Sequence, residues 1–392
     1  MPYVALPILP VFRQLTLMDL LMGVEEIPNA PVVWNDTSTR THFARTLDRN
    51  FTRQYDFARM TQLLREFNTK HAGLFERDRA SLYDSFKIPK RRGGLRQIDA
   101  PCPELMNALR ELKILFEREF SPSRNRCSLY HTSAFAYIPG RCAKDALERH
   151  RGNKSNWFLK LDFSNFFGST TKEFVLGMLN RIFPFSEVMK TPAGSDALIK
   201  AVDLCFLNGG LPQGTPISPM LTNLVMLPVD YELSRGLRRL EKPTADLPDG
   251  NRFCYTRYAD DILISARRGF SFTEVQAVLE QVLDHFEAPY VCKEDKTHYG
   301  SKAGRNWSLG LMLNKDNEIT VGWQKKKRLR AMIDSYMTKH EAWSLSEIQS
   351  MAGQLSYLRS IEPEYFEKAM ESYDKRYGRS ILRRIKEDLK GG

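Results

Sequence analysis

The sequence lacks the cysteine patterns that mark metal-binding or redox domains. Its six cysteines are scattered, and no two of them have a C-x-x-C spacing. This excludes the common zinc and thiol-redox motifs. Most of the cysteines are therefore expected to be small core residues in a reducing compartment.

Long apolar segments are also missing. No run approaches the ~20 apolar residues that a membrane helix needs. The apolar stretch MPYVALPILPVF at the N-terminus contains prolines and no basic region, unlike a signal peptide. Internal repeats and low-complexity tracts are absent as well. These absences predict a cytoplasmic protein that does not enter a membrane.

Positive charge, in contrast, is in excess. The 392 residues carry a formal net charge of +11, and 42% of them are hydrophobic, enough to build a core. A basic balance of this size favours a polyanionic partner, most simply a nucleic acid. A basic protein without such a partner is the alternative that charge alone leaves open.

Residue spacing in the first half of the chain indicates both strands and helices. The segment 86–101 is expected to form two short strands around the turn Gly93-Gly94. Segment 104–120 has the apolar spacing of an amphipathic helix. The stretch WFLKLDFSNFFGST (157–170) begins as a strand.

Three helices are expected to follow. Thr170 and Glu173 form a capping-box pattern before the first. The segment LPQGTPISPMLTNLVM (211–226) is a turn leading into the second, which Pro228 is expected to kink or interrupt. The third, within 271–288, has a regular apolar stripe and is capped by its first serine. This order predicts an α+β fold in which helices cover one face of an antiparallel sheet and leave the other face for a ligand.

Two adjacent carboxylates interrupt what otherwise reads as a buried hairpin, RYADDILIS (257–265). Asp260 and Asp261 repel each other by about 4 kcal/mol at 4 Å and an effective dielectric constant of 20. A purely structural turn would more often use Asn-Gly or Asp-Gly. An exposed turn is the alternative explanation for an isolated Asp-Asp pair.

A third carboxylate, Asp162, ends the strand of segment 157–170. If that strand pairs with the hairpin, three carboxylates meet at one point. Hard oxygen ligands in this number suit Mg²⁺ or Mn²⁺. Two such ions form a known clamp for in-line phosphoryl transfer.

Three motifs taken together resemble the active-site motifs of reverse transcriptases. Along the chain they are LDFSNFF, LPQGTPISPMLTNLVM and RYADDILIS. The chain is most similar to prokaryotic enzymes of the retron and defence-associated type, over about residues 85–370. The resemblance implies a right-hand polymerase with an antiparallel palm sheet. The implied parts are an N-terminal helical extension (1–80), fingers (81–156), palm (157–323) and a thumb with basic helices (324–392).

The resemblance also implies the catalytic residues. Asp162 and Asp260 would be the principal ligands of two Mg²⁺ ions, or of Mn²⁺, and Asp261 would be the third carboxylate. Lys296 would protonate the leaving pyrophosphate or hold the phosphates. A plain surface charge is the alternative for this lysine.

The nucleotide site follows in the same way. Phe167, five residues after Asp162, would be the steric gate that collides with a ribose 2′-hydroxyl, whereas one of Phe166 and Phe167 is expected to be core. The remaining nucleotide contacts would be Gln213, Gly214 and Arg96, helped by Lys87 or Lys90.

Primer and template contacts complete the implied set. The residues are Tyr258, Ala259, Lys325, Lys326, Lys327, Arg328, Tyr357 and Arg359. Leu355 and Leu358, in the same thumb segment, are expected to pack between helices.

By resemblance, the function is an RNA-directed DNA polymerase that uses dNTPs on a structured non-coding RNA, makes an RNA/DNA duplex and serves antiviral defence, with a toxin or effector protein as a further partner. Two departures leave the retron class open against other defence-associated enzymes. DALERH has Asp145 where an NAxxH-like motif has Asn, and SLG (308–310) replaces VTG. An RNA-dependent RNA polymerase and a catalytically idle RNA-binding scaffold are the rival functions.

Overall fold

The computed structural model describes residues 55–89, 93–120, 130–243, 250–302 and 310–391, together with 245, 248 and 307. Lys90 and most of the predicted N-terminal extension lie outside the described residues. Among the residues that are described, no helix combines the length and the apolar character needed to span a lipid bilayer.

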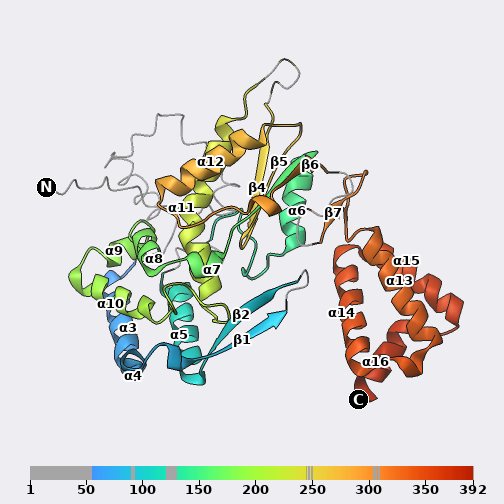
Figure 1. Cartoon of the computed structure of the whole chain (residues 1–392), viewed down its shortest axis with the longest axis horizontal. Coiled ribbons are helices and arrows are strands. Elements are labelled where there is room, and N and C mark those ends of the chain that lie inside the picture. The colour runs from blue at the N-terminus through green and yellow to red at the C-terminus, as the bar shows by residue number, and fades with distance from the viewer. Residues whose placement is uncertain are drawn as a thin grey trace.

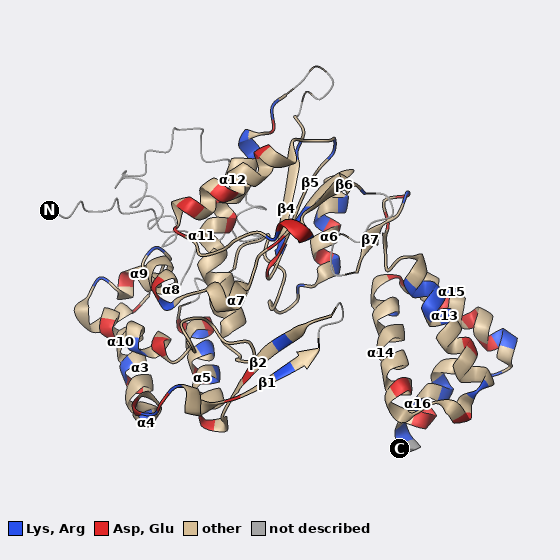
Figure 2. Cartoon of the chain, viewed as in Figure 1, with Lys and Arg blue, Asp and Glu red and all other residues tan. Residues whose placement is uncertain are grey.

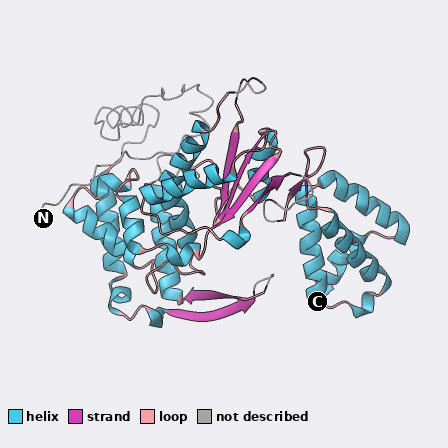
Figure 3. Ribbon diagram, turned by 45° about the horizontal axis from the view of Figure 1, so that its top comes forward, coloured by secondary structure: helices cyan, strands magenta, loops and turns pink. Residues whose placement is uncertain are grey.

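A separate two-stranded hairpin is the first β structure. Strand β1 (Tyr83–Pro89) pairs antiparallel with β2 (Leu95–Pro101), which confirms the prediction of two strands around the glycine pair. Helix α5 (Pro103–Glu119) follows, with proline in its first turn and a buried apolar face, as predicted. The hairpin projects beside the remainder of the fold in Figure 3.

A four-stranded sheet lies at the centre of the molecule (Figure 1). Its strands are β3 (Trp157–Asp162), β4 (Phe253–Tyr258), β5 (Asp261–Ala266) and β6 (His298–Ser301). The order is β4-β5-β3-β6, and each neighbouring pair is antiparallel. Strand β3 therefore occupies an inner position between the hairpin β4-β5 and β6.

One face of this sheet belongs to the main hydrophobic core. Leu159 and Leu161 of β3 pack there with residues of α11 (Ser218–Arg239) and α12 (Phe272–His285). The same core includes α8 (Lys172–Leu179), the short helix α9 (Phe185–Val188) and α10 (Pro192–Asp203).

The opposite face is also covered at one end. Phe158 stacks on Trp307 with ring centroids 5.0 Å apart, and α6 (Ala143–Gly152) packs against β4. The prediction that one whole face stays free is therefore wrong. At this end, the apolar side chains of Phe158 and Leu263 are buried under other residues. Because side chains alternate along a strand, Lys160 and Asp162 lie on the same face as Phe158, further toward the other end.

Two local predictions on the helices are also corrected. Helix α11 is not interrupted at Pro228, because the burial of the residues around the proline outweighs the loss of one N–H donor. The cap of α8 is Thr171, whose hydroxyl accepts from the amide of Phe174. Thr170 is buried instead, and its hydroxyl donates to the carbonyl of Phe166 at 2.8 Å.

The first described helices share the main core. Helix α3 (Phe57–Lys70) packs on α10 through Met60, Leu64 and Phe67, and the short helix α4 (Ala72–Glu76) follows it. The Asn68 amide donates to the carbonyl of Ala197 at 2.9 Å. This part of the predicted N-terminal extension is thus packed as part of the larger unit.

A helical bundle with its own core ends the chain. It contains α13 (Trp323–Thr338), α14 (Leu345–Ile361), α15 (Pro363–Tyr377) and α16 (Ile381–Gly391), preceded by the small hairpin β7 (Met312–Leu313) and β8 (Ile319–Thr320). Leu355 and Leu358 are buried in it, as predicted. Lys and Arg, blue in Figure 2, mark both strands of the β1-β2 hairpin and the start of α13.

Candidate active site

Three carboxylates meet at one end of the central sheet. Asp162, the last residue of β3, is the direct antiparallel partner of Asp261, the first residue of β5. Asp260 lies in the turn just before β5, and its carbonyl accepts from the amide of Phe163 at 3.1 Å. The strand register therefore brings together acids that lie about a hundred residues apart in the sequence, as the sequence predicted.

The turn that carries Asp260 is strained. Only Ala259 and Asp260 separate β4 from β5, and Ala259 has a φ of 57°, a conformation that favours glycine. A residue of this kind in the left-handed region costs about 1–2 kcal/mol. Such strain persists where surrounding contacts fix the conformation, and it concentrates at functional sites.

Lysines supply the positive charge that the adjacent acids require. The Nζ of Lys293 lies 2.7 Å and that of Lys296 2.9 Å from Oδ1 of Asp162. On the other strand, Lys160 Nζ lies 3.0 Å from Asp261 Oδ1. Burial raises the pKa of the Asp162 carboxyl, but the hydrogen bonds from the two lysines outweigh it and hold that pKa below its ordinary value.

Asp260 has the opposite electrostatic environment. Its pKa is raised, first by burial and then by the neighbouring charges of Asp162 and Asp261. A divalent cation would relieve this excess of negative charge, and carboxylate oxygens are the donors that Mg²⁺ and Mn²⁺ prefer. The three acids therefore fit such an ion in donor chemistry.

The described part of the chain contains no ready-made group of three or more histidine, cysteine or acidic ligands around one point. Both oxygens of Asp162 are instead engaged by an ammonium group. Binding a cation would require Asp162 to exchange these partners.

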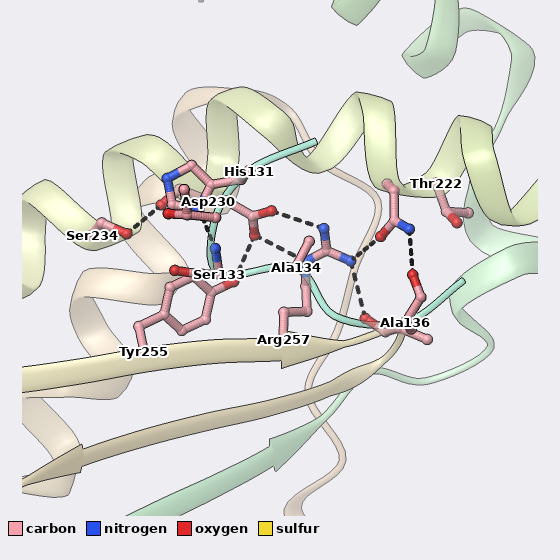
Figure 4. Close-up of polar contacts among 12 residues, drawn as sticks. His131, Ser133, Ala134, Ala136, Thr222, Asp230, Ser234, Tyr255 and Arg257 are labelled. Carbon is pink, nitrogen blue, oxygen red and sulfur yellow. Dashed lines mark hydrogen bonds and ion pairs between the residues drawn. The ribbon is translucent and has the colours of Figure 1, made fainter. Parts of the chain in front are cut away.

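A buried ion pair anchors the strand that leads to the turn (Figure 4). Arg257 of β4 and Asp230 of α11 are both fully buried, with Nη2 and Oδ2 2.8 Å apart. The Arg257 Nε also donates to Asp230 Oδ1 at 2.9 Å, and the Tyr255 hydroxyl donates to the same oxygen at 2.6 Å. The carboxylate is thus well satisfied, which a buried charge requires.

The same arginine connects two more segments to the turn. Its Nη1 donates to Asn223 Oδ1 at 3.0 Å and to the carbonyl of Ala259 at 3.4 Å. Its backbone pairs with the loop before α6, because its amide donates to Ser133 and its carbonyl accepts from Phe135. Arg257 therefore links α11, this loop and the strained turn.

The two phenylalanines after Asp162 have different surroundings. Phe166 is a core residue, 3% exposed, whereas Phe167 is only partly buried against the core. This agrees with the expectation that one of them packs in the core. Both belong to the short helix α7 (Phe166–Ser169), which begins one residue after Asn165, at a φ of 45°.

The segment before α11 lies against the β1-β2 hairpin. The carbonyl of Gln213 accepts from the amide of Asp99 at 2.8 Å. A Cβ on Gly214, whose φ is 129°, would lie 2.7 Å from the carbonyl oxygen of Asp99. Gly214 was expected to let the backbone approach a nucleotide. In this structure, its backbone instead lies close to that of β2.

The predicted phosphate-binding residues of the hairpin point in different directions. Ile88 pairs with Arg96, and Lys87 pairs with Gln97, one position along. Because neighbouring positions in a strand face opposite sides, Lys87 and Arg96 lie on opposite faces of the hairpin. The expectation that Arg96 binds the triphosphate with help from Lys87 or Lys90 stays a prediction, and the register means that Lys87 would approach from the other face of the hairpin.

The basic start of α13 is only partly available to a ligand. Lys326 forms an ion pair with Glu362 and lies 4.0 Å from the centre of the Tyr365 ring, so its charge already has a partner. Lys325 donates to the carbonyl of Gly310 at 3.0 Å and lies over the Tyr357 ring. The predicted set also contains two exposed residues of α13, Lys327 and Arg328, and Arg359, which is paired with Glu367 on the surface.

In the segment DALERH (145–150), which departs from the retron pattern, two residues have structural roles. Asp145 accepts from the amide of Cys142 at 2.7 Å and completes a capping box at the start of α6. His150 is fully buried, with its ring nitrogens 2.5 Å from Ser265 Oγ and 2.8 Å from Thr256 Oγ1. This histidine therefore fastens α6 to the sheet.

Several residues around the site were not predicted from the sequence. Lys293 and Lys160 neutralise the acids, and Asp230 holds the buried arginine. Lys293 lies three residues before Lys296, and this spacing was a usable signal. Nothing in the sequence around Asp230 distinguishes it from a surface acid of a helix.

Comparison with known proteins agrees with this geometry. Residues 88–312 match the family described as "Reverse transcriptase (RNA-dependent DNA polymerase)". The Escherichia coli retron Ec83 reverse transcriptase is 26% identical over 80% of this chain and 92% of its own length. The Myxococcus xanthus retron Mx65 and Mx162 enzymes are 26% and 28% identical over 74% of this chain, which spans 64% and 59% of their lengths.

The solved structures that resemble the fold are more distant. Apo telomerase from Candida tropicalis aligns with a TM-score of 0.44 and 12% identity, over 78% of this chain and 62% of that one. Candida albicans telomerase with a fragment of telomeric RNA gives a TM-score of 0.40 and 12% identity, over 74% and 56% of the two chains.

Proposed function

The chain belongs to the reverse transcriptase (RNA-dependent DNA polymerase) family, and on that premise we propose that it extends a DNA strand on an RNA template from dNTPs by two-metal phosphoryl transfer. The observation that carries the proposal is the pairing of Asp162 with Asp261, beside Asp260 in the strained turn. The three aspartates lie at the same end of a rigid sheet, where a catalytic group is best positioned.

The three aspartates would hold the metal ions. When bound, two Mg²⁺ ions supply Lewis-acid activation of a 3′-hydroxyl and charge neutralisation at the leaving pyrophosphate. In the free protein, the lysines at Asp162 offset the electrostatic repulsion among the acids. Lys296, whose side chain is 46% exposed, would turn toward a phosphate when Asp162 changes partners.

Other residues of this chain would select and hold the nucleotide. Phe167, only partly buried and five residues after Asp162, would exclude a ribose 2′-hydroxyl by collision. Arg96, exposed on β2, would hold the triphosphate through its forked guanidinium group. Gln213, whose carbonyl is fixed by Asp99, would contact the nucleotide or the template, with Gly214 beside it.

The architecture we propose for this activity is a right hand. The β1-β2 hairpin and its surroundings (81–156) would be the fingers, the central sheet region (157–323) the palm, and the C-terminal bundle (324–392) the thumb. Tyr258 and Ala259 would contact the primer end from the palm. Lys325, Lys327 and Arg328 of the bundle would contact the backbone of the duplex, together with Tyr357 and Arg359.

The biological setting is proposed from the relatives. The retron enzymes that the chain resembles support a structured non-coding RNA as template and partner. A role in antiviral defence in the cytoplasm, with a toxin or effector protein, follows from the same likeness.

A single-nucleotide incorporation assay on a primed RNA template tests the proposal. Purified protein with Mg²⁺ should add the templated dNTP far faster than the matching rNTP, and Phe167→Ala should reduce that preference. Faster use of the rNTP would favour an RNA-dependent RNA polymerase. Binding of the RNA without any incorporation, in Mg²⁺ or in Mn²⁺, would favour an idle RNA-binding scaffold.

A further inference from the structure

Tyr137 is an exposed aromatic residue in a loop that is otherwise buried. Its side chain is 58% exposed, whereas Ala136 is fully buried and Ile138 is only 4% exposed. Its φ is 59°, in the left-handed region that a bulky residue rarely adopts. Such an outlier is a reason to look for a function.

The loop that carries Tyr137 is held by hydrogen bonds to α11, to β4 and within itself. The carbonyl of Ala136 accepts from Asn223 Nδ2 of α11 at 2.8 Å, which Figure 4 shows beside the buried ion pair. The amide of Phe135 donates to the carbonyl of Arg257 at 2.9 Å, and Arg141 Nη1 donates to the carbonyl of Ala134 at 2.7 Å. These contacts hold the backbone at Tyr137 in place, so its ring is presented in a defined position.

That position is beside the proposed steric gate. The Tyr137 and Phe167 rings meet edge to face, with centroids 6.2 Å apart and planes at 76°. This lies within the range in which aromatic pairs attract.

A steric gate discriminates only if it cannot turn aside. Phe167 is partly buried and lies in a four-residue helix, so its core contacts restrain only part of the ring. The Phe167 ring also contacts the Phe166 ring edge to face, with ring centroids 5.8 Å apart. Tyr137 adds a contact from a separate, fixed loop.

We propose that Tyr137 is a positioning residue for Phe167 and that the contact between the two rings sets the discrimination between dNTP and rNTP. The inference rests on the proposed function, in which Phe167 excludes the 2′-hydroxyl. Loss of the Tyr137 ring would let Phe167 move away from the sugar without changing the carboxylates or their lysines.

The test is the ratio of kcat/KM for a dNTP to that for the matching rNTP, measured on a primed RNA template. Wild type, Tyr137→Ala, Tyr137→Phe, Phe167→Ala and the double variant Tyr137→Ala/Phe167→Ala are compared. Tyr137→Ala should lower the ratio roughly two- to tenfold, the size of one aromatic pair contact. Tyr137→Phe should keep the ratio, because it keeps the ring, and the double variant should match Phe167→Ala.

The outcomes separate this inference from the proposed function. If Phe167→Ala lowers the ratio and Tyr137→Ala does not, the gate stands and the positioning role is overturned. If Phe167→Ala leaves the ratio unchanged, both the gate and the inference are overturned. If Tyr137→Phe lowers the ratio as much as Tyr137→Ala, or if the two alanine effects multiply in the double variant, Tyr137 acts independently of Phe167 and the inference fails.

Folding is controlled in the same series. Because the Tyr137 side chain is mostly exposed, Tyr137→Ala should unfold within a few degrees of the wild-type temperature. Tyr137→Leu, which fills part of the ring volume without an aromatic edge, provides a second measurement should the alanine variant be unstable. A lower rate for both nucleotides at an unchanged ratio would show a merely structural role and overturn the inference.

Discussion

Asp162 lies directly opposite Asp261 across the β3-β5 pair, and each of the two carboxylates is bonded to lysine: Asp162 to Lys293 and Lys296, Asp261 to Lys160. Two like charges on opposed strand positions would destabilise the sheet if nothing opposed them. The lysines offset this repulsion before any cation binds. The protein can therefore fold stably with these acids side by side when no cation is bound.

Replacing the acids of the turn should remove activity without removing the fold. Asp260→Asn combined with Asp261→Asn keeps size and polarity but removes two anionic ligands, so DNA synthesis should fall at least about 10³-fold. Binding of RNA, measured by a gel-shift or anisotropy titration, should be retained. Glu371→Gln on the exposed surface of α15 is the matched control. Synthesis by the double variant at the control's rate would contradict the metal assignment.

The buried ion pair should be far more important for stability than a surface pair. Asp230→Asn leaves the fully buried Arg257 without its counter-charge, and such a change costs about 3–5 kcal/mol in the free energy of unfolding. Glu387→Gln breaks the exposed pair with Arg383, 2.9 Å apart, and should cost less than about 0.5 kcal/mol. Urea denaturation measures both. Equal effects in the two variants would show that Asp230 does not stabilise Arg257 as described.

Two glycines offer a matched test of the contact between the hairpin and the segment before α11. Gly214→Ala places a Cβ 2.7 Å from the Asp99 carbonyl at a φ of 129°, so it should lose about 1–3 kcal/mol of stability. Gly353→Ala, in helix α14 with no atom within 4 Å of the new Cβ, should gain about 0.5–1 kcal/mol.

The two glycine variants should also differ in their kinetics. Because Gly214→Ala must shift β2 or the Gln213 segment, it should raise the KM for dNTP, whereas Gly353→Ala should leave it unchanged. A wild-type KM together with wild-type stability for Gly214→Ala would mean that the two segments do not approach as closely as described.

Buried histidines should make the protein less stable in acid. Burial, with a smaller contribution from Arg149, lowers the pKa of His150 from 6.5 to about 3. The unfolded chain therefore takes up a proton near pH 6.5 that the folded chain refuses. Stability from this group is complete above pH 6.5 and is lost as the pH falls toward 3, by up to about 1.4 kcal/mol per pH unit.

Variants that cannot titrate separate this effect from that of the carboxylates. His150→Gln can still bond to Ser265 and Thr256, and its unfolding free energy should depend on pH less steeply than that of the wild type below pH 6.5, by about one proton. His131→Gln should behave similarly, because burial lowers the pKa of His131 to about 4. Parallel pH profiles for wild type and both variants would exclude the histidines as the cause.

The features that could be predicted from the sequence are those that are encoded locally. The hairpin around the two glycines, the apolar face of α5 and the serine cap of α12 depend on residues within a few positions of one another. The pairing of Asp162 with the later hairpin required one assumption about strand pairing, which the register confirms.

The features that were missed depend on long-range pairing. Lys326 has Glu362 as a partner 36 positions away, and Lys293 reaches Asp162 across 131 positions. The opposite faces of Lys87 and Arg96 follow from the hairpin register, which the intervening loop does not reveal in the sequence. Pro228 remains inside α11 because tertiary burial outweighs the preference of proline for a helix end.

Strand β3 contributes side chains to both hydrophobic cores. Leu159 and Leu161 contribute to one core and Phe158 to the other, and the strand is hydrogen-bonded on both sides, to β5 and to β6. Unfolding of either core would remove packing contacts from β3. The two cores should therefore unfold in one cooperative transition. The slowest-exchanging backbone amides of the protein should then be found in the strand that ends at a catalytic acid.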